Sequence, residues 1–258
     1  QAQFKYNRVD FYLGTSITNT NYQRNGLFEN GNYQGAESFG KGEKQSFTDF
    51  SFKAGATYKI TGRHLIDVNL GSLSKAPTIR NTFTNARQNN NVTIGLESEK
   101  IQDIDIGYIY RSPIIKARLT GFYSNFSDGT DLGFYFTENL GGLGLEQDAF
   151  IQEVMTNVEK QHIGIEFGIE AQVTPTIKLK GAASMGQYTF NNNPNLYITS
   201  DDLDGPVTFG DGTTKLKDYH VAGGPERAYQ VGFEYRDPKF WWVGLTTNYF
   251  SNAYVDVN

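Results

Sequence analysis

The feature that most constrains this sequence is an alternation of apolar and polar residues with a period of two. Between residues 163 and 173 every odd position is Ile, Phe, Ala or Val, and every even position is Gly, Glu or Gln. Successive side chains of a strand point to opposite faces, whereas one helical face recurs every three or four residues. The segment therefore predicts a strand with one apolar and one polar face.

The same alternation recurs along the chain in segments of roughly 10 residues. Aromatic residues reach 14% and glycine occurs 28 times, a composition that favours pleated structure. The sequence therefore predicts an all-β fold of about nine strands, over residues 9–17, 48–60, 64–73, 101–110, 114–126, 163–173, 177–189, 228–235 and 241–249.

The connections between these segments alternate between short and long. The short ones span residues 61–63, 111–114, 174–176 and 236–240, and the long ones span 25–45, 74–98, 127–161 and 191–226. An antiparallel sheet with short turns at one end and long loops at the other is typical of outer-membrane barrels, whose periplasmic turns are short and whose extracellular loops are long. The long connections are therefore predicted to be extracellular.

Hydropathy is compatible with a barrel and incompatible with membrane helices. Mean hydropathy is −0.49, and no apolar run approaches the roughly 20 residues that a spanning helix needs. A soluble β-sandwich or propeller is the alternative, but the hairpins are unevenly spaced and the long loops lie at one end only. Aromatic residues gather at both strand ends, as in interfacial girdles: Tyr58, Tyr110, Tyr235, Phe240, Trp241 and Trp242 at the short turns, and Phe47, Phe126, Phe190, Tyr249 and Phe250 opposite.

Two stretches also carry a family resemblance. The first resembles the barrel of TonB-dependent receptors and runs from Ser74-Lys75-Ala76-Pro77 through the asparagines 89–91 and Leu96-Glu97-Ser98-Glu99 to Asp105-Ile106-Gly107-Tyr108. The second resembles the late barrel of the branch with a carboxypeptidase-like regulatory domain ahead of its plug, and comprises Gly-Pro-Glu-Arg-Ala-Tyr at 224–229 and Tyr-Arg-Asp-Pro-Lys-Phe-Trp-Trp at 235–242.

The resemblance implies a plugged transmembrane antiparallel up-and-down β-barrel of about 22 strands in the outer membrane of a Gram-negative bacterium. Residues 1–258 are then expected to be a C-terminal portion of that barrel, incomplete at both ends and without the plug. An odd strand count and the lack of a signal peptide at the first residues agree with this expectation. The implied partners are outer-membrane lipid, the TonB complex through the plug, a nutrient ligand and a surface lipoprotein.

Catalytic and cofactor chemistry find little support in the sequence. His64, His162 and His220 lie on different segments without metal-ligand spacing, and there is no cysteine. His162 and Glu170 share the polar face of one strand with Glu166, but strand residues four apart are separated by roughly 13 Å. We therefore expect no enzyme activity, metal site or cofactor. A net charge of −5 without a basic stripe also argues against nucleic acid as a partner.

The long loops contain the candidate ligand contacts, because loops on a rigid scaffold usually carry recognition. These candidates are Arg80, Arg87, Asn89, Asn90, Phe134, Tyr135, Tyr197 and Tyr219. The acidic stretch with Asp201, Asp202, Asp204 and Asp211 offers oxygen ligands for Ca²⁺, although it lacks the spacing of a known calcium loop and is more simply a solvated acidic loop.

The three-residue turn 174–176 predicts a register in which paired residue numbers sum to 350. Phe167 then lies beside Ala183 on the apolar face, and Glu170 lies opposite Lys180 on the polar face as a weak ion pair. A slip by one residue would turn the lysines of the second strand into lipid, which fixes the register.

Two functions remain open at this point. One is energised uptake of a nutrient through a plugged receptor, and the other is a barrel retained as a structural or assembly partner of envelope proteins. The substrate cannot be read from the sequence, because receptors for siderophores, haem, cobalamin, glycans and peptides share this barrel wall.

Overall fold

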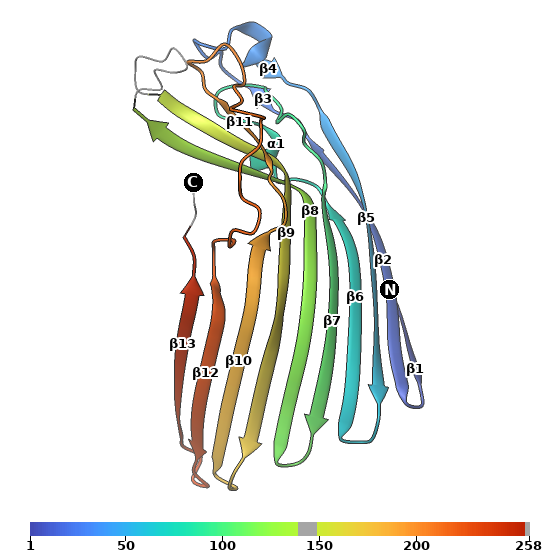
Figure 1. The fold of residues 1–258 in the computed structure, drawn as a ribbon. Coiled ribbons are helices and arrows are strands. Elements are labelled where there is room, and N and C mark those ends of the chain that lie inside the picture. The colour runs from blue at the N-terminus through green and yellow to red at the C-terminus, as the bar shows by residue number, and fades with distance from the viewer. Residues whose placement is uncertain (139–148, 256–258) are drawn as a thin grey trace.

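The computed structural model describes residues 1–138 and 149–255 and consists mainly of one curved antiparallel sheet (Figure 1). Its strands follow one another in chain order, each hydrogen-bonded to the next. They are β1 (Ala2–Tyr6), β2 (Val9–Tyr22), β5 (Gln45–Lys59), β6 (His64–Lys75), β7 (Glu99–Arg111), β8 (Ile115–Thr137), β9 (Ala149–Gln172), β10 (Ile177–Phe190), β12 (Pro225–Arg236) and β13 (Trp242–Ala253).

The remaining elements lie in the long connections at one end of the sheet (Figure 1). β11 (Asn195–Thr199) pairs with β9, and β3 (Asn25–Gly26) pairs with β4 (Gly40–Lys41). Two short helices, η1 (Gly35–Glu37) and α1 (Ile79–Thr82), complete the described structure. Neither they nor any other helix of the described residues is long and apolar enough to cross a membrane.

All nine predicted strands are present, and the up-and-down topology is confirmed. A tenth strand in the same path, β1, was not predicted because its five residues are too few to establish a period. It pairs with β2 from Ala2 opposite Leu13 to Tyr6 opposite Val9. The path therefore contains ten strands instead of nine, and the predicted odd count is not found along it. The sheet is nevertheless open, since β1 and β13 do not pair with each other among the described residues.

The predicted register between β9 and β10 is confirmed, with Glu170 opposite Lys180 and Phe167 opposite Ala183. The predicted ion pair is wrong. Lys180 Nζ lies 2.9 Å from Glu234 Oε2 on β12, and Glu170 Oε1 lies 3.1 Å from Lys178 Nζ. Both contacts are diagonal, because long side chains reach a neighbour two positions along the adjacent strand.

The predicted loop 127–161 is mostly strand. β8 continues to Thr137 and β9 begins at Ala149, so the two strands form a hairpin that projects beyond the rest of the sheet (Figure 1). Register shifts separate Phe126 from Gly129 and Gly129 from Asp131. Such bulges bend a strand and strengthen its twist, and here they mark the point where the hairpin leaves the barrel wall.

The two faces of the sheet differ as the alternation predicts. One face presents large apolar side chains that remain solvent-accessible in the isolated sheet, including Ile17 at 65%, Phe50 at 64% and Leu245 at 69% exposure. The other face is polar and hollowed. Packed apolar clusters occur instead around the projecting hairpin, where Val154 contacts Leu132 and Tyr197. A sheet that buries so little on its apolar face is built for a lipid surrounding.

Candidate functional site

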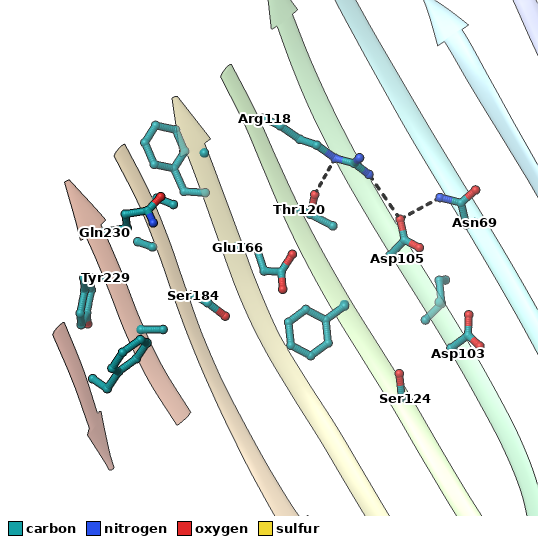
Figure 2. Close-up of a pocket in the computed structure, with 18 of the residues that line it drawn as sticks. Asn69, Asp103, Asp105, Arg118, Thr120, Ser124, Glu166, Ser184, Tyr229 and Gln230 are labelled. Atoms are coloured by element: carbon teal, nitrogen blue, oxygen red, sulfur yellow. Dashed lines mark hydrogen bonds and ion pairs between the residues drawn. The ribbon is translucent and has the colours of Figure 1, made fainter. Parts of the chain in front are cut away.

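A groove of about 1000 Å³ runs along the polar face of the sheet, which we call the lumenal groove (Figure 2). It crosses the strands from β6 to β13. Its polar lining includes Asn69, Asp103, Asp105, Arg118, Thr120, Ser124, Glu166, Ser184, Gln230 and Asn248. The alternation places these side chains on one face because strand positions two apart point the same way.

A chain of hydrogen bonds fixes the groove wall and joins side chains from four strands, β2, β6, β7 and β8. Arg118 on β8 donates to Asp67 Oδ2 at 2.8 Å and lies 4.0 Å from Asp105 Oδ1. Asn69 donates to Asp105 Oδ1 at 2.9 Å and accepts a hydrogen bond from Tyr12 at 3.1 Å. Because each side chain constrains the next, this wall is preorganised rather than a loose polar surface.

Glycines on the lumenal face make room for these side chains. A Cβ added at Gly55 would lie 2.3 Å from the Tyr12 ring, and one at Gly107 would lie 2.3 Å from Asp67 Oδ1. Separations below 3.0 Å do not occur for real Cβ atoms. The wall is thus built from large side chains that lie flat over glycines of the adjacent strand.

A second cavity, of about 720 Å³, lies between three long connections at the loop end, and we call it the loop cavity. Its residues come from positions 32–43, 84–94 and 197–206. Tyr197 Oη accepts a hydrogen bond from the Ile94 backbone N–H at 2.9 Å, and Gln88 donates to Asp201 Oδ2 at 3.1 Å. Asn32 donates to the Asp201 carbonyl at 3.3 Å, so all three connections are joined.

Arg24 holds the first of these connections against the second. Its Nε donates to the Ala86 carbonyl at 2.7 Å, and its Nη1 donates at 2.6 Å both to the Ser38 carbonyl and to Asn90 Oδ1. Asn90 in turn donates to the Ala36 carbonyl at 2.8 Å. A planar guanidinium supplies several donors in fixed directions, which suits a clamp between two loops.

The charges that line the loop cavity have one sign. Its lining contains five carboxylates and neither Lys nor Arg among the described residues: Glu37, Glu43, Asp201, Asp202 and Asp204. Burial raises the pKa of the Tyr33 phenol, a hydrogen bond with Asn89 opposes this rise, and the nearby carboxylates, Asp201 first among them, add to it. Burial likewise raises the pKa of Tyr197. Both phenols are therefore neutral hydrogen-bonding groups at physiological pH.

Of the residues predicted to contact ligand, the structure places Asn90 and Tyr197 in the lining of the loop cavity. Asn89 is only 1% exposed, and its Oδ1 accepts the backbone N–H of Asn91. Asn89 therefore stabilises the loop from inside. Arg87 and Tyr219 are exposed and belong to neither cavity lining.

The other predicted contacts lie on the projecting hairpin or, in the case of Arg80, against it. Arg80 on α1 lies over the Phe134 ring at 5.7 Å, and Phe134 packs against the apolar cluster around Val154. Tyr135 points to the opposite face of the hairpin and donates to Glu153 Oε2 at 2.6 Å. Phe134 and Tyr135 are strand residues of β8 rather than loop residues, so at these two positions the loop assignment is wrong.

Sequence reasoning missed Tyr33, Glu37 and Glu43, because the first connection shows no period and no recognisable motif. It also considered the acidic stretch only as a calcium loop. Asp201, Asp202 and Asp204 line the loop cavity, whereas Asp211 does not and instead accepts hydrogen bonds from Thr213. Within residues 1–138 and 149–255, no three His, Cys, Asp or Glu side chains group closely enough to hold a metal ion.

Comparisons with known proteins bear on this architecture. The family model for the β-barrel of TonB-dependent receptor-like proteins matches residues 1–258. Among solved structures, the copper transporter OprC superimposes with a TM-score of 0.62 at 15% identity. The FrpB iron transporter from Neisseria meningitidis does so with a TM-score of 0.56 at 14% identity. No curated protein sequence matches.

The superpositions cover nearly all of this chain but only part of each solved structure. The matches extend over 94% of this chain with OprC and 96% with FrpB, but over only 32% and 31% of those proteins. The chain thus spans about a third of each solved structure. At such low identity the likeness establishes the fold and says nothing of the substrate.

Proposed function

Because the chain belongs to the TonB-dependent receptor β-barrel family, we propose that it forms part of a receptor that imports a nutrient with energy delivered through TonB. The family consists of outer-membrane receptors and transporters of Gram-negative bacteria and is not an enzyme family. This chain contributes lipid-facing wall, lumenal groove and extracellular loops. The plug, its contact with TonB, a regulatory domain and a lipoprotein partner belong to the proposal.

The observation that carries the proposal is the joining of three extracellular connections into one cavity. A barrel kept only as a structural partner needs a lipid-facing wall, but it has no need of a cavity closed by hydrogen bonds between Ile94 and Tyr197 and between Gln88 and Asp201. Recognition sites are concave, and volumes of about 300 to 1,000 Å³ are usual for small ligands. The loop cavity fits that description.

A growth assay tests uptake directly. A strain that lacks the gene is compared on single nutrients with strains complemented by the full receptor, in backgrounds with and without TonB. We expect one nutrient to support growth only when both receptor and TonB are present. Equal growth of all strains on every nutrient would contradict uptake and would favour the structural role.

A variant of the loop cavity links that phenotype to this chain. Tyr197→Ala removes a wall of the cavity, and we expect it to lower growth on the required nutrient. Tyr219→Ala is the matched control, because Tyr219 is 56% exposed outside the cavity lining. Receptor levels in the outer membrane are measured in both strains to separate binding from assembly.

A further inference from the structure

Carboxylates of the loop cavity have no ion-pair partner among the described residues. None of Glu37, Glu43, Asp202 and Asp204 takes part in an ion pair among the described residues. Like charges gathered around a partly enclosed space repel one another, and the effective dielectric there is below that of water. A ligand of positive charge would relieve this repulsion, whereas an anion would add to it.

Gln152, which adjoins the lining of the same cavity without belonging to it, supplies an independent observation. Its side chain is completely buried, and neither Nε2 nor Oε1 has a hydrogen-bond partner among the described residues. It lies directly opposite Thr199, which lines the cavity, so the two side chains share one face of the sheet. An unpaired buried amide costs about 1 to 3 kcal/mol, and a polar group inserted beside Thr199 would supply the missing hydrogen-bond partner.

The remaining walls combine neutral polar side chains with an aromatic and apolar part. Tyr33 and Tyr197 line the cavity together with Val92 and Ile94. An aromatic face attracts ammonium and guanidinium groups, and an apolar wall suits the aliphatic stems that carry them. Carboxylates beside aromatic rings therefore match a ligand that has both stem and cation.

From these observations we propose that the loop cavity binds a cationic organic ligand, a short peptide with at least two Lys or Arg side chains. The inference rests on the uptake function proposed above and names its substrate class. An anionic metal chelate would be repelled by the five carboxylates in the lining. A bare metal ion lacks a group of three ligands among the described residues. A neutral oligosaccharide leaves the negative charge uncompensated.

The sign of the charge persists in the lumenal groove. Its lining contains Asp103, Asp105 and Glu166 against a single cation, Arg118, among the described residues. Closer to the short turns the charges balance, because Lys178 and Lys180 pair with Glu170 and Glu234. A cation that leaves the loop cavity therefore passes the negatively charged lumenal groove first. It then reaches the part of the wall near the short turns, where positive and negative side chains are paired.

Titration calorimetry on the purified full-length receptor tests the proposal. The probes are three mixtures of tetrapeptides, with two Lys or Arg residues, two Glu residues, or only Ser and Gly, together with maltotetraose. We expect heat of binding only with the basic mixture, and an affinity that falls as salt increases, since exposed charges are screened.

A charge-removing variant locates the binding. Asp202→Asn combined with Asp204→Asn should lower the affinity about five- to tenfold, because each exposed charge pair contributes a few tenths to about 1 kcal/mol. Asp218→Asn is the matched control. Asp218 is exposed on the same connection outside the lining, and its φ of 70° suits asparagine as well as aspartate.

Several results would overturn the cationic class. They are binding of the neutral or acidic probes at equal affinity, no binding of the basic mixture, and an unchanged affinity of the double variant. TonB-dependent growth on a neutral nutrient would support the proposed uptake function and contradict the cationic ligand class. Binding of basic peptides without any TonB-dependent growth would retain the class and reject uptake.

Discussion

Gly107 illustrates how single residues shape the lumenal wall. Asp67 lies over this glycine, is 8% exposed and is held by Arg118, so its carboxylate has little freedom to move. We expect Gly107→Ala to displace that carboxylate and to destabilise the barrel by about 1 to 3 kcal/mol. The measurement is the temperature at which the purified full-length receptor loses its folded band on a heat-modifiability gel.

Gly168→Ala is the control for this prediction. Gly168 lies on the same lumenal face opposite Arg118, and an added Cβ would meet nothing within 4 Å. Alanine in a strand interior is favoured over glycine by roughly 0.5 to 1 kcal/mol, so this variant should melt at the parental temperature or slightly above it. Equal losses in both variants would show that glycine is required for the backbone rather than for Asp67.

Ala182 and Ala183 allow the two faces of β10 to be compared with one change. Ala183 lies between Phe167 and Tyr229 on the lipid face, whereas Ala182 lies between Gly168 and Gln230 on the lumenal face. Ala183→Asp places a carboxylate in hydrocarbon at a cost of up to a few kcal/mol. We expect a several-fold lower yield of folded receptor in the outer membrane than for Ala182→Asp. Equal yields would contradict the assignment of faces.

At this scale the sequence predicts positions better than partners. The turn 174–176 determines which residues of β9 and β10 are opposite, and that register is confirmed. It does not determine which carboxylate Lys180 contacts, because Glu234 arrives on β12 from more than fifty positions away along the chain. Ion pairs on a wet face depend on every neighbouring strand.

Among the elements, the projecting hairpin of β8 and β9 shows where period-two reasoning ends. Residues 127–161 include five glycines and have acidic residues near their start, and both features are typical of a loop. The hairpin nevertheless forms, since β11 pairs with β9 and Tyr197 packs against Leu132 and Val154. Those contacts join segments about 40 to 65 residues apart, and a local pattern does not contain them.

Tyr197 connects this element to the connection 76–98, and its hydroxyl is the part that can be tested. Tyr197→Phe leaves the Ile94 backbone N–H without its acceptor at a cost of about 1 to 2 kcal/mol. We expect proteolysis of the connection 76–98 to be about tenfold faster in the purified receptor. Tyr219→Phe, which removes a hydroxyl from an exposed side chain, should leave the rate unchanged. Identical rates in both variants would show that the hydrogen bond does not hold the connection.

For the whole molecule, the alternation of connections determines both architecture and orientation. Short turns gather at one end of the curved sheet and long connections at the other, as Figure 1 shows. The loop cavity itself was not predictable, because Glu37 and Asp201 lie far apart in sequence and meet only through the folded loops. Orientation, by contrast, follows from length alone, since extracellular loops are the long ones.

Labelling of intact cells tests that orientation. The chain has no cysteine, so a single introduced thiol is the only one in it. Arg87→Cys lies exposed on the connection 76–98, and Gly62→Cys lies exposed in a short turn, where an added side chain meets nothing within 4 Å. Both thiols are therefore accessible in the protein, and only the membrane distinguishes them.

We expect a membrane-impermeant maleimide to label Arg87→Cys strongly on intact cells and Gly62→Cys only at background. Permeabilised cells should label both variants to a similar extent, which excludes burial as the reason for the difference. Strong labelling of Gly62→Cys on intact cells, with none of Arg87→Cys, would invert the topology. The loop cavity would then open to the periplasm, where the barrel has no external ligand to capture, and the uptake proposal would fail with it.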